Sequence, residues 1–162
     1  MLSRISPVFK AMLAPRFREG SVLSTTGEVE IALPDDDPET LELLCNIVHM
    51  TGDIPTQLAS TRILTLALLC DKYNGPAALK ALIHGWMYIS HTNKKTSVQA
   101  ELLGAACALR FTDLARRFMQ ELVMRDSLRT SAVDQATTIP QHVIGKKASY
   151  ARMWTHILIF YS

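Results

Sequence analysis

Residues 28–33 alternate between polar and apolar side chains, and this period of two predicts a half-buried β-strand that ends at Pro34. A helix is predicted to follow, because Asp37 can accept hydrogen bonds from first-turn amides and Pro38 suits the first helical position. Its apolar residues share one face, and Gly52 can adopt the left-handed conformation that ends a helix. The strand has an edge that must pair with another strand, and the helix has an apolar face that must be buried. Other parts of the chain have to provide both.

Apolar residues at helical spacing predict five further helices. The first is a short helix opened by Ser6 and Pro7, and residues 21–25 after it are a candidate partner strand. Gln99 has the spacing of a capping box for a later helix. The four remaining helices are predicted to begin at a capping threonine or after a proline, namely Thr61, Pro76, Thr96 and Thr112. The sequence shows no internal repeat.

Length and hydrophobic content fit one globular domain, since 48% of the 162 residues are hydrophobic. The net charge of +2 gives no argument for nucleic acid or a membrane as partner. No apolar run resembles a signal peptide or a membrane span. Acidic residues are interspersed among the arginines between residues 110 and 129. This pattern favours a solvated helix face over a nucleic-acid binding surface. The three cysteines, Cys45, Cys70 and Cys107, are widely spaced, and each is interpreted as a small core residue. Unpaired cysteines favour a reducing compartment, the cytosol or the nucleus.

The sequence predicts no catalytic motif, cofactor site or metal site. No histidine has a second histidine or a cysteine at metal-ligand spacing. Asp35, Asp36 and Asp37 could surround a hard cation, but a turn before a helix needs capping groups, which aspartates supply. Phosphate-binding loops and nucleophile elbows are absent from the sequence, so an enzyme would need residues that only the fold brings together.

Several linked motifs resemble the BTB/POZ family. They are SPVFKAML at residues 6–13, FREG at 17–20, VEIALPDDDP at 29–38, HMTG at 49–52 and LLCDKY at 68–73. The resemblance covers residues 1–90, and two later helices in residues 91–126 are similar to the extension of many BTB proteins, notably fungal ones. Residues 127–162 are predicted to be a linker and tail, polar to residue 148 and apolar at 153–161.

The resemblance implies an α+β, mainly helical fold, with a BTB/POZ-like helical cluster, a short incomplete β-sheet and a C-terminal helical extension. Family members normally have two strands and part of a helix before the serine-proline motif. This chain has only five residues before Ser6, so a truncated N-terminus is expected, or a strand from another chain. The function implied is protein-protein interaction by a dimerisation or scaffold module. The alternatives are a substrate adaptor of a cullin-based ubiquitin ligase and an enzyme with an unrecognised site.

Phe17 and Glu19 are the candidate partner-binding residues. In cullin-binding members of the family, a hydrophobic residue and a glutamate two positions later follow the helix opened by the serine-proline motif, and Phe17 and Glu19 stand there. An exposed aromatic ring can fill an apolar pocket of a partner while a carboxylate fixes the orientation. A structural interpretation fits as well, with Phe17 covering the core and Glu19 solvated.

Overall fold

The computed structural model describes residues 2–93 and 95–130, and within these ranges the fold is entirely helical. The expected α+β fold with a β-sheet is therefore wrong for this part of the chain. Its eight helices are α1 (Leu2–Ile5), α2 (Pro7–Met12), α3 (Arg18–Thr26), α4 (Pro38–His49), α5 (Ser60–Lys72), α6 (Ala77–Ser90), α7 (Thr96–Ala108) and α8 (Thr112–Thr130). The apolar run at residues 153–161 lies outside the described residues.

Residues 28–33 are irregular backbone and form no ladder with any described segment. Thr26 makes the hydrogen bonds at the start of this segment, and Leu33 only closes a local turn with Asp36. The candidate partner strand, residues 21–25, instead belongs to α3, which ends at the left-handed Gly27. A period of two creates a strand only where another edge is available to pair with it, and α3 removes that edge.

Two helix starts were predicted correctly from capping residues. The Ser6 hydroxyl accepts a hydrogen bond from the Phe9 amide at 3.2 Å, and the Asp37 carboxylate accepts one from the Thr40 amide at 2.9 Å. Each cap is followed by a proline at the first helical position. Local hydrogen bonding is sufficient to define these starts.

The threonine caps were wrong. Helices α7 and α8 begin at Thr96 and Thr112 themselves, and α5 begins one residue before Thr61. Neither α5 nor α7 has a side-chain cap. Buried Gln99, predicted to complete a capping box, donates its amide hydrogens to the carbonyls of His91 at 3.0 Å and Asn93 at 2.6 Å.

Helices α4, α5 and α7 end in the same way. A left-handed residue follows each helix, and the next amide bonds back to a carbonyl in the last turn. The left-handed residues are Met50, Asn74 and Arg110, so the residue at the end of α4 is Met50, although Gly52 also has a positive φ.

The hairpins α5–α6 and α7–α8 form a structural repeat. The bounds of α7, its left-handed residue and its closing hydrogen bond all follow their α5 counterparts at one constant offset along the chain. The buried positions correspond too, for example Leu66 with Leu102 and Tyr73 with Leu109. This repeat is not visible in the sequence, because the shared feature is burial and backbone geometry while the residue types differ.

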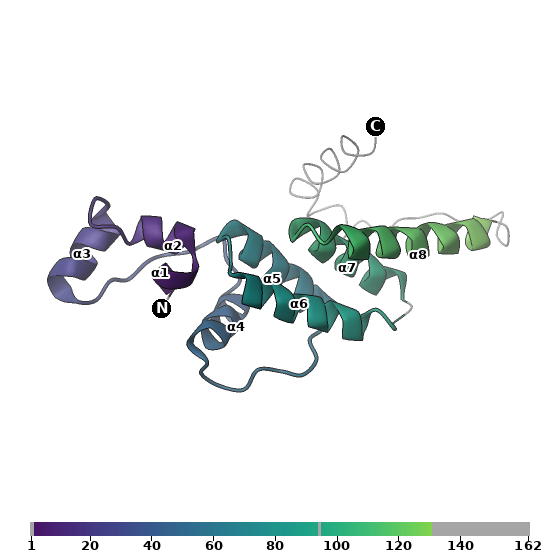
Figure 1. Cartoon of the computed structure of the whole chain (residues 1–162), viewed down its shortest axis with the longest axis horizontal. Helices are drawn as coiled ribbons and strands as arrows, with labels where there is room; N and C mark the ends of the chain where they lie inside the picture. Colours follow the sequence, from purple (N-terminus) through teal and green to yellow (C-terminus); the bar gives the residue numbers. More distant parts are fainter. Residues whose placement is uncertain (1, 94, 131–162) are drawn as a thin grey trace.

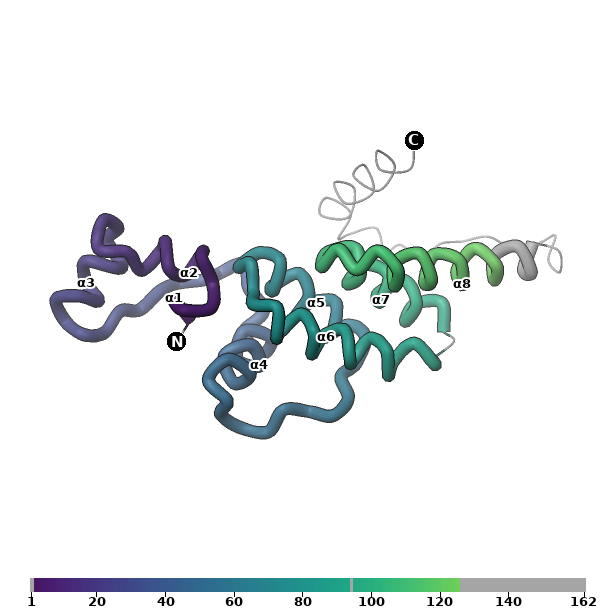
Figure 2. The backbone as a smooth tube through the Cα atoms, in the orientation of Figure 1, coloured from purple at the N-terminus to yellow at the C-terminus, as the bar shows by residue number. Residues whose placement is uncertain are grey.

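The helices form an elongated stack (Figure 1). Helix α5 packs against α4, α6 and α7, and α7 packs against α8, so α5 and α7 form the centre of the core. The N-terminal helices α1–α3 lie at one end of the molecule, away from α7 and α8 (Figure 2). The long connection of residues 28–37 links them to α4.

Tyr73, the residue after α5, attaches the N-terminal helices to this stack. Its carbonyl accepts the Ser6 hydroxyl proton, and its ring stacks on Phe9 with centroids 4.4 Å apart. Its hydroxyl donates to the Asp36 carboxylate, which also bonds the Lys72 ammonium at 2.7 Å. The Asp36 side chain is 3% exposed, so its negative charge depends on these two donors. We call Ser6, Phe9, Asp36, Lys72 and Tyr73 the Tyr73 cluster.

Tyr73→Phe is expected to lower the free energy of unfolding at pH 7 by about 1.5–3 kcal/mol, because Asp36 loses one of its two donors. Burial, followed by the hydrogen bond to Asp36, raises the pKa of Tyr73 above its ordinary 10.0. The unfolded chain then loses this proton first, so wild-type stability falls as the pH rises above about 10.

Denaturant unfolding at several pH values tests this expectation. Tyr73→Phe should show a smaller decline above pH 10 than the wild type. The matched control is Tyr88→Phe, because Tyr88 is 59% exposed on α6. Equal pH dependence in the wild type and Tyr73→Phe would contradict the role given to the Tyr73 hydroxyl.

Candidate protein-interaction surface

The two predicted partner-binding residues lie together where the chain enters α3. Phe17 is the N-cap residue of α3 and its side chain is 44% exposed. Glu19 stands in the first turn of the same helix and is half-buried. Val22 follows Glu19 by three positions, which places the two on one helix face, and it is also exposed. The start of α3 thus carries an exposed aromatic ring, a half-buried carboxylate and an exposed aliphatic side chain.

The exposed ring of Phe17 does not cover the helical core. The Arg16 guanidinium lies over the ring, 5.0 Å from its centroid. Such a stacked cation contributes about 0.5–1 kcal/mol at an exposed site and holds the ring in a preferred position. The alternative in which Phe17 is a core residue is therefore not supported by its exposure.

The position of this turn is determined by α2 and by Gly20. Ser6 and Phe9 attach α2 to Tyr73, and the Phe17 amide bonds the Ala14 carbonyl at 2.9 Å. Gly20 is the only buried residue of α3, because the preceding turn passes directly over it. A Cβ atom at Gly20 would lie 2.1 Å from the Ala14 oxygen and 2.6 Å from the Leu13 oxygen. We call residues 7–26 the N-terminal arm.

Two of the three consecutive aspartates have structural roles, as the preference for capping over a cation site implied. Asp37 caps α4, and Asp36 belongs to the Tyr73 cluster. Within residues 2–93 and 95–130, no group of three potential metal-ligating side chains comes together. Of the histidines in these ranges, His84 packs its ring against Phe111 edge-on, with centroids 5.2 Å apart.

The three cysteines are free thiols in or against the core. Burial raises the pKa of Cys45, Cys70 and Cys107, so these thiols stay protonated at neutral pH. This agrees with their interpretation as small core residues. None of the helices in the described ranges has the length and apolar character needed to cross a membrane.

The arginines of α8 are partly paired with acidic neighbours on the same helix. Arg116 lies 3.8 Å from Asp113, and Arg117 lies 3.7 Å from Glu121. The first pair is exposed and the second is partly so, and such solvated pairs contribute little to stability. This pattern fits the solvated helix face expected from the sequence.

Comparison with known proteins gives no match to this chain among protein-family models, curated proteins or solved structures. The BTB/POZ resemblance thus remains a prediction from the quoted motifs. The sequence had suggested Phe17 and Glu19 but not what holds them in place. The residues that hold this region in place include Asp36 and Tyr73. They are far apart in the chain and come into contact only in the folded structure.

Gly20→Ala is expected to destabilise the N-terminal arm by about 1–3 kcal/mol, because the new methyl group meets two backbone oxygens that cannot move independently. Hydrogen exchange should show faster opening of residues 13–26 with little change in α5 and α7. The matched control is Gly85→Ala in α6, where a Cβ meets nothing within 4 Å. That substitution should stabilise the helix by about 0.5–1 kcal/mol. An unchanged arm in Gly20→Ala would contradict the close approach.

Proposed function

We propose that this chain is a protein-protein interaction module that acts as a dimerisation or scaffold unit of BTB/POZ type. The observation that carries the proposal is the exposure of Phe17 beside Glu19 on an arm that extends from the helical stack. Aromatic residues that remain accessible and are held in place by the backbone lose little entropy on binding. The N-terminal arm has both properties.

The rest of the arm supports the same function. Helix α3 contributes only Gly20 to the buried residues, and most of its other side chains are exposed. Its position is nevertheless defined, through α2, by the Tyr73 cluster. An exposed helix on a fixed support offers a partner a preformed surface. We also propose a cytosolic or nuclear location, which the three free cysteines support.

A second candidate function, adaptor of a cullin-based ubiquitin ligase, is favoured by the spacing of Phe17 and Glu19. In this arrangement Phe17 would enter an apolar pocket of the cullin, and Glu19 would pair with a basic residue at its rim. The half-buried environment of Glu19 strengthens such a pair relative to a fully solvated one. The cullin is suggested as a partner by the family resemblance alone. The support from the structure is that the Phe17 ring is exposed.

Light scattering during size-exclusion chromatography of the full chain, alone and mixed with a cullin N-terminal region, tests both functions. A scaffold module is expected to elute as a dimer that ignores the cullin. An adaptor is expected to co-elute with it, and Glu19→Arg should abolish co-elution while circular dichroism stays unchanged. Phe17→Ala should weaken whichever complex forms by at least about tenfold, as expected for a central aromatic anchor.

Two variants serve as controls. Tyr88→Ala removes an exposed aromatic residue from α6, and Glu42→Arg reverses an exposed charge on α4. Neither should change the dimer or the cullin complex. A folded monomer that binds no cullin would contradict both functions. The remaining alternative would then be an enzyme with an unrecognised site.

A further inference from the structure

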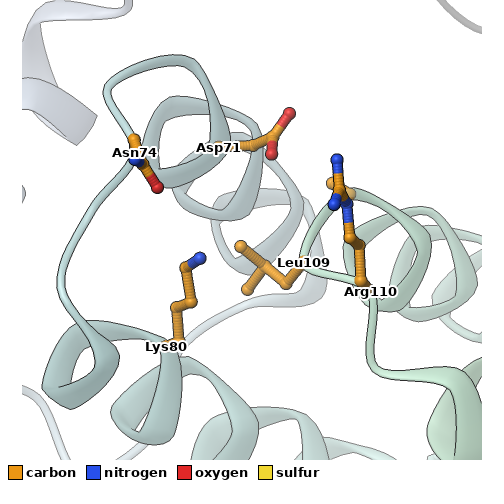
Figure 3. Close-up of a pocket in the computed structure, with 6 residues that line it drawn as sticks. Asp71, Asn74, Lys80, Leu109 and Arg110 are labelled. Atoms are coloured by element: carbon orange, nitrogen blue, oxygen red, sulfur yellow. The ribbon is translucent and has the colours of Figure 1, made fainter. Parts of the chain in front are cut away.

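A polar hollow of about 390 Å³ lies where the C-terminal ends of α5 and α7 meet (Figure 3). The two helix ends come together because α5 and α7 pack side by side as equivalent parts of the repeat. Asn74 and Arg110, their left-handed residues, stand on opposite sides of the hollow. Its lining residues are Asp71, Asn74, Lys80, Ala108, Leu109 and Arg110.

The charged side chains of this hollow do not neutralise one another in pairs. Among the described residues, Asp71, Lys80 and Arg110 form no ion pair and no side-chain hydrogen bond. Lys80 is half-buried, whereas Asp71, Asn74 and Arg110 are exposed. The lining contains two cationic side chains and one carboxylate, which leaves an excess of positive charge.

The helix ends do not account for both cations. A lysine or arginine near a helix C-terminus often pairs with free carbonyl groups. Here backbone amides already occupy carbonyls in both last turns. The Gly75 amide bonds the Cys70 carbonyl at 2.7 Å, and the Phe111 amide bonds the Ala106 carbonyl at 2.9 Å. Lys80 and Arg110 therefore remain available to an external anion.

We infer that this hollow binds a carboxylate group from an acidic peptide segment of a partner protein. The Arg110 guanidinium offers two parallel N–H donors to a carboxylate, and Lys80 adds a charged donor from the facing helix α6. The Asn74 amide group supplies a further neutral donor, and Asp71 accepts a peptide N–H beside the bound group. This surface is separate from the N-terminal arm and does not depend on the function proposed for it.

Asp71 limits the preference of the hollow for multiply charged anions. Its carboxylate offsets part of the positive charge of Lys80 and Arg110, and the resulting loss of attraction is larger for a doubly charged phosphate than for a carboxylate. Substitution of Asp71 should consequently change which anion is preferred. This expectation separates a built recognition site from a general attraction between opposite charges.

Two-dimensional NMR of the isotope-labelled full chain is the direct test, at about 0.15 M salt so that long-range attraction is screened. The probe is an acetylated and amidated hexapeptide of alternating glutamate and alanine. We expect saturable shifts at the amides of Asn74, Lys80 and Leu109. The expected dissociation constant is about 1 mM, because only one carboxylate is bound. The peptide with glutamine in place of glutamate should give no saturable shift.

Three variants locate the site. Arg110→Asn should weaken binding about tenfold, and asparagine tolerates the left-handed backbone at this position. Asp71→Asn should strengthen peptide binding several-fold and admit inorganic phosphate, which the wild type should bind more weakly than the peptide. Arg116→Gln removes an exposed charge of α8 and should leave binding unchanged. If Arg110→Asn does not fold, Lys80→Gln replaces it with the same expected loss.

Some outcomes would overturn the inference. They are equal shifts with the glutamine peptide, an equal loss of binding in Arg110→Asn and Arg116→Gln, or phosphate binding to the wild type as tight as that of the peptide. The Phe17→Ala variant should retain peptide binding, so failure of the function proposed for the arm is distinguishable from failure of this site.

Discussion

The Asp36 carboxylate is the constraint on which the arrangement of the N-terminal half depends. Its side chain is almost fully removed from water, and a carboxylate in such surroundings is stable only with donors that replace the lost water. Lys72 and Tyr73 are those donors, and both stand at the end of α5. This requirement fixes the turn before α4 against the end of α5. Because the same tyrosine also receives Ser6 and Phe9, it fixes α2 as well.

The other half of the molecule is organised by repetition of one helix ending. Helices α4, α5 and α7 each close with a left-handed residue and a backbone hydrogen bond to the last turn. At α5 and α7 this ending leads directly into the second helix of a hairpin, so two equivalent hairpins stack through α5 and α7. A left-handed arginine or methionine is less favourable than a glycine, and packing of the hairpins offsets that cost.

The end of α5 therefore serves two surfaces at once. Tyr73 points into the cluster that supports the N-terminal arm, where Phe17 and Glu19 are exposed. Asp71 and Asn74, within two residues of it, line the polar hollow shared with α7. The two surfaces differ in chemistry, since one is apolar and aromatic and the other is charged. The interactions proposed for them are therefore independent of each other.

The sequence by itself determined those features that depend on neighbouring residues. Ser6 with Pro7 and Asp37 with Pro38 opened the expected helices, because a cap and its amide are only three residues apart. Threonine caps failed at Thr61, Thr96 and Thr112, since each of these residues lies within its helix and not before it.

Only the tertiary structure decided whether residues 28–33 would form a strand, since pairing needs an edge that local sequence does not supply. It also decided the repeat of the two hairpins, whose residue types differ, and the meeting of Asp36 with Tyr73. These features join residues that are distant in the chain. The local sequence determines which groups of a segment require a hydrogen-bond partner or burial. Tertiary packing determines which distant residues provide it.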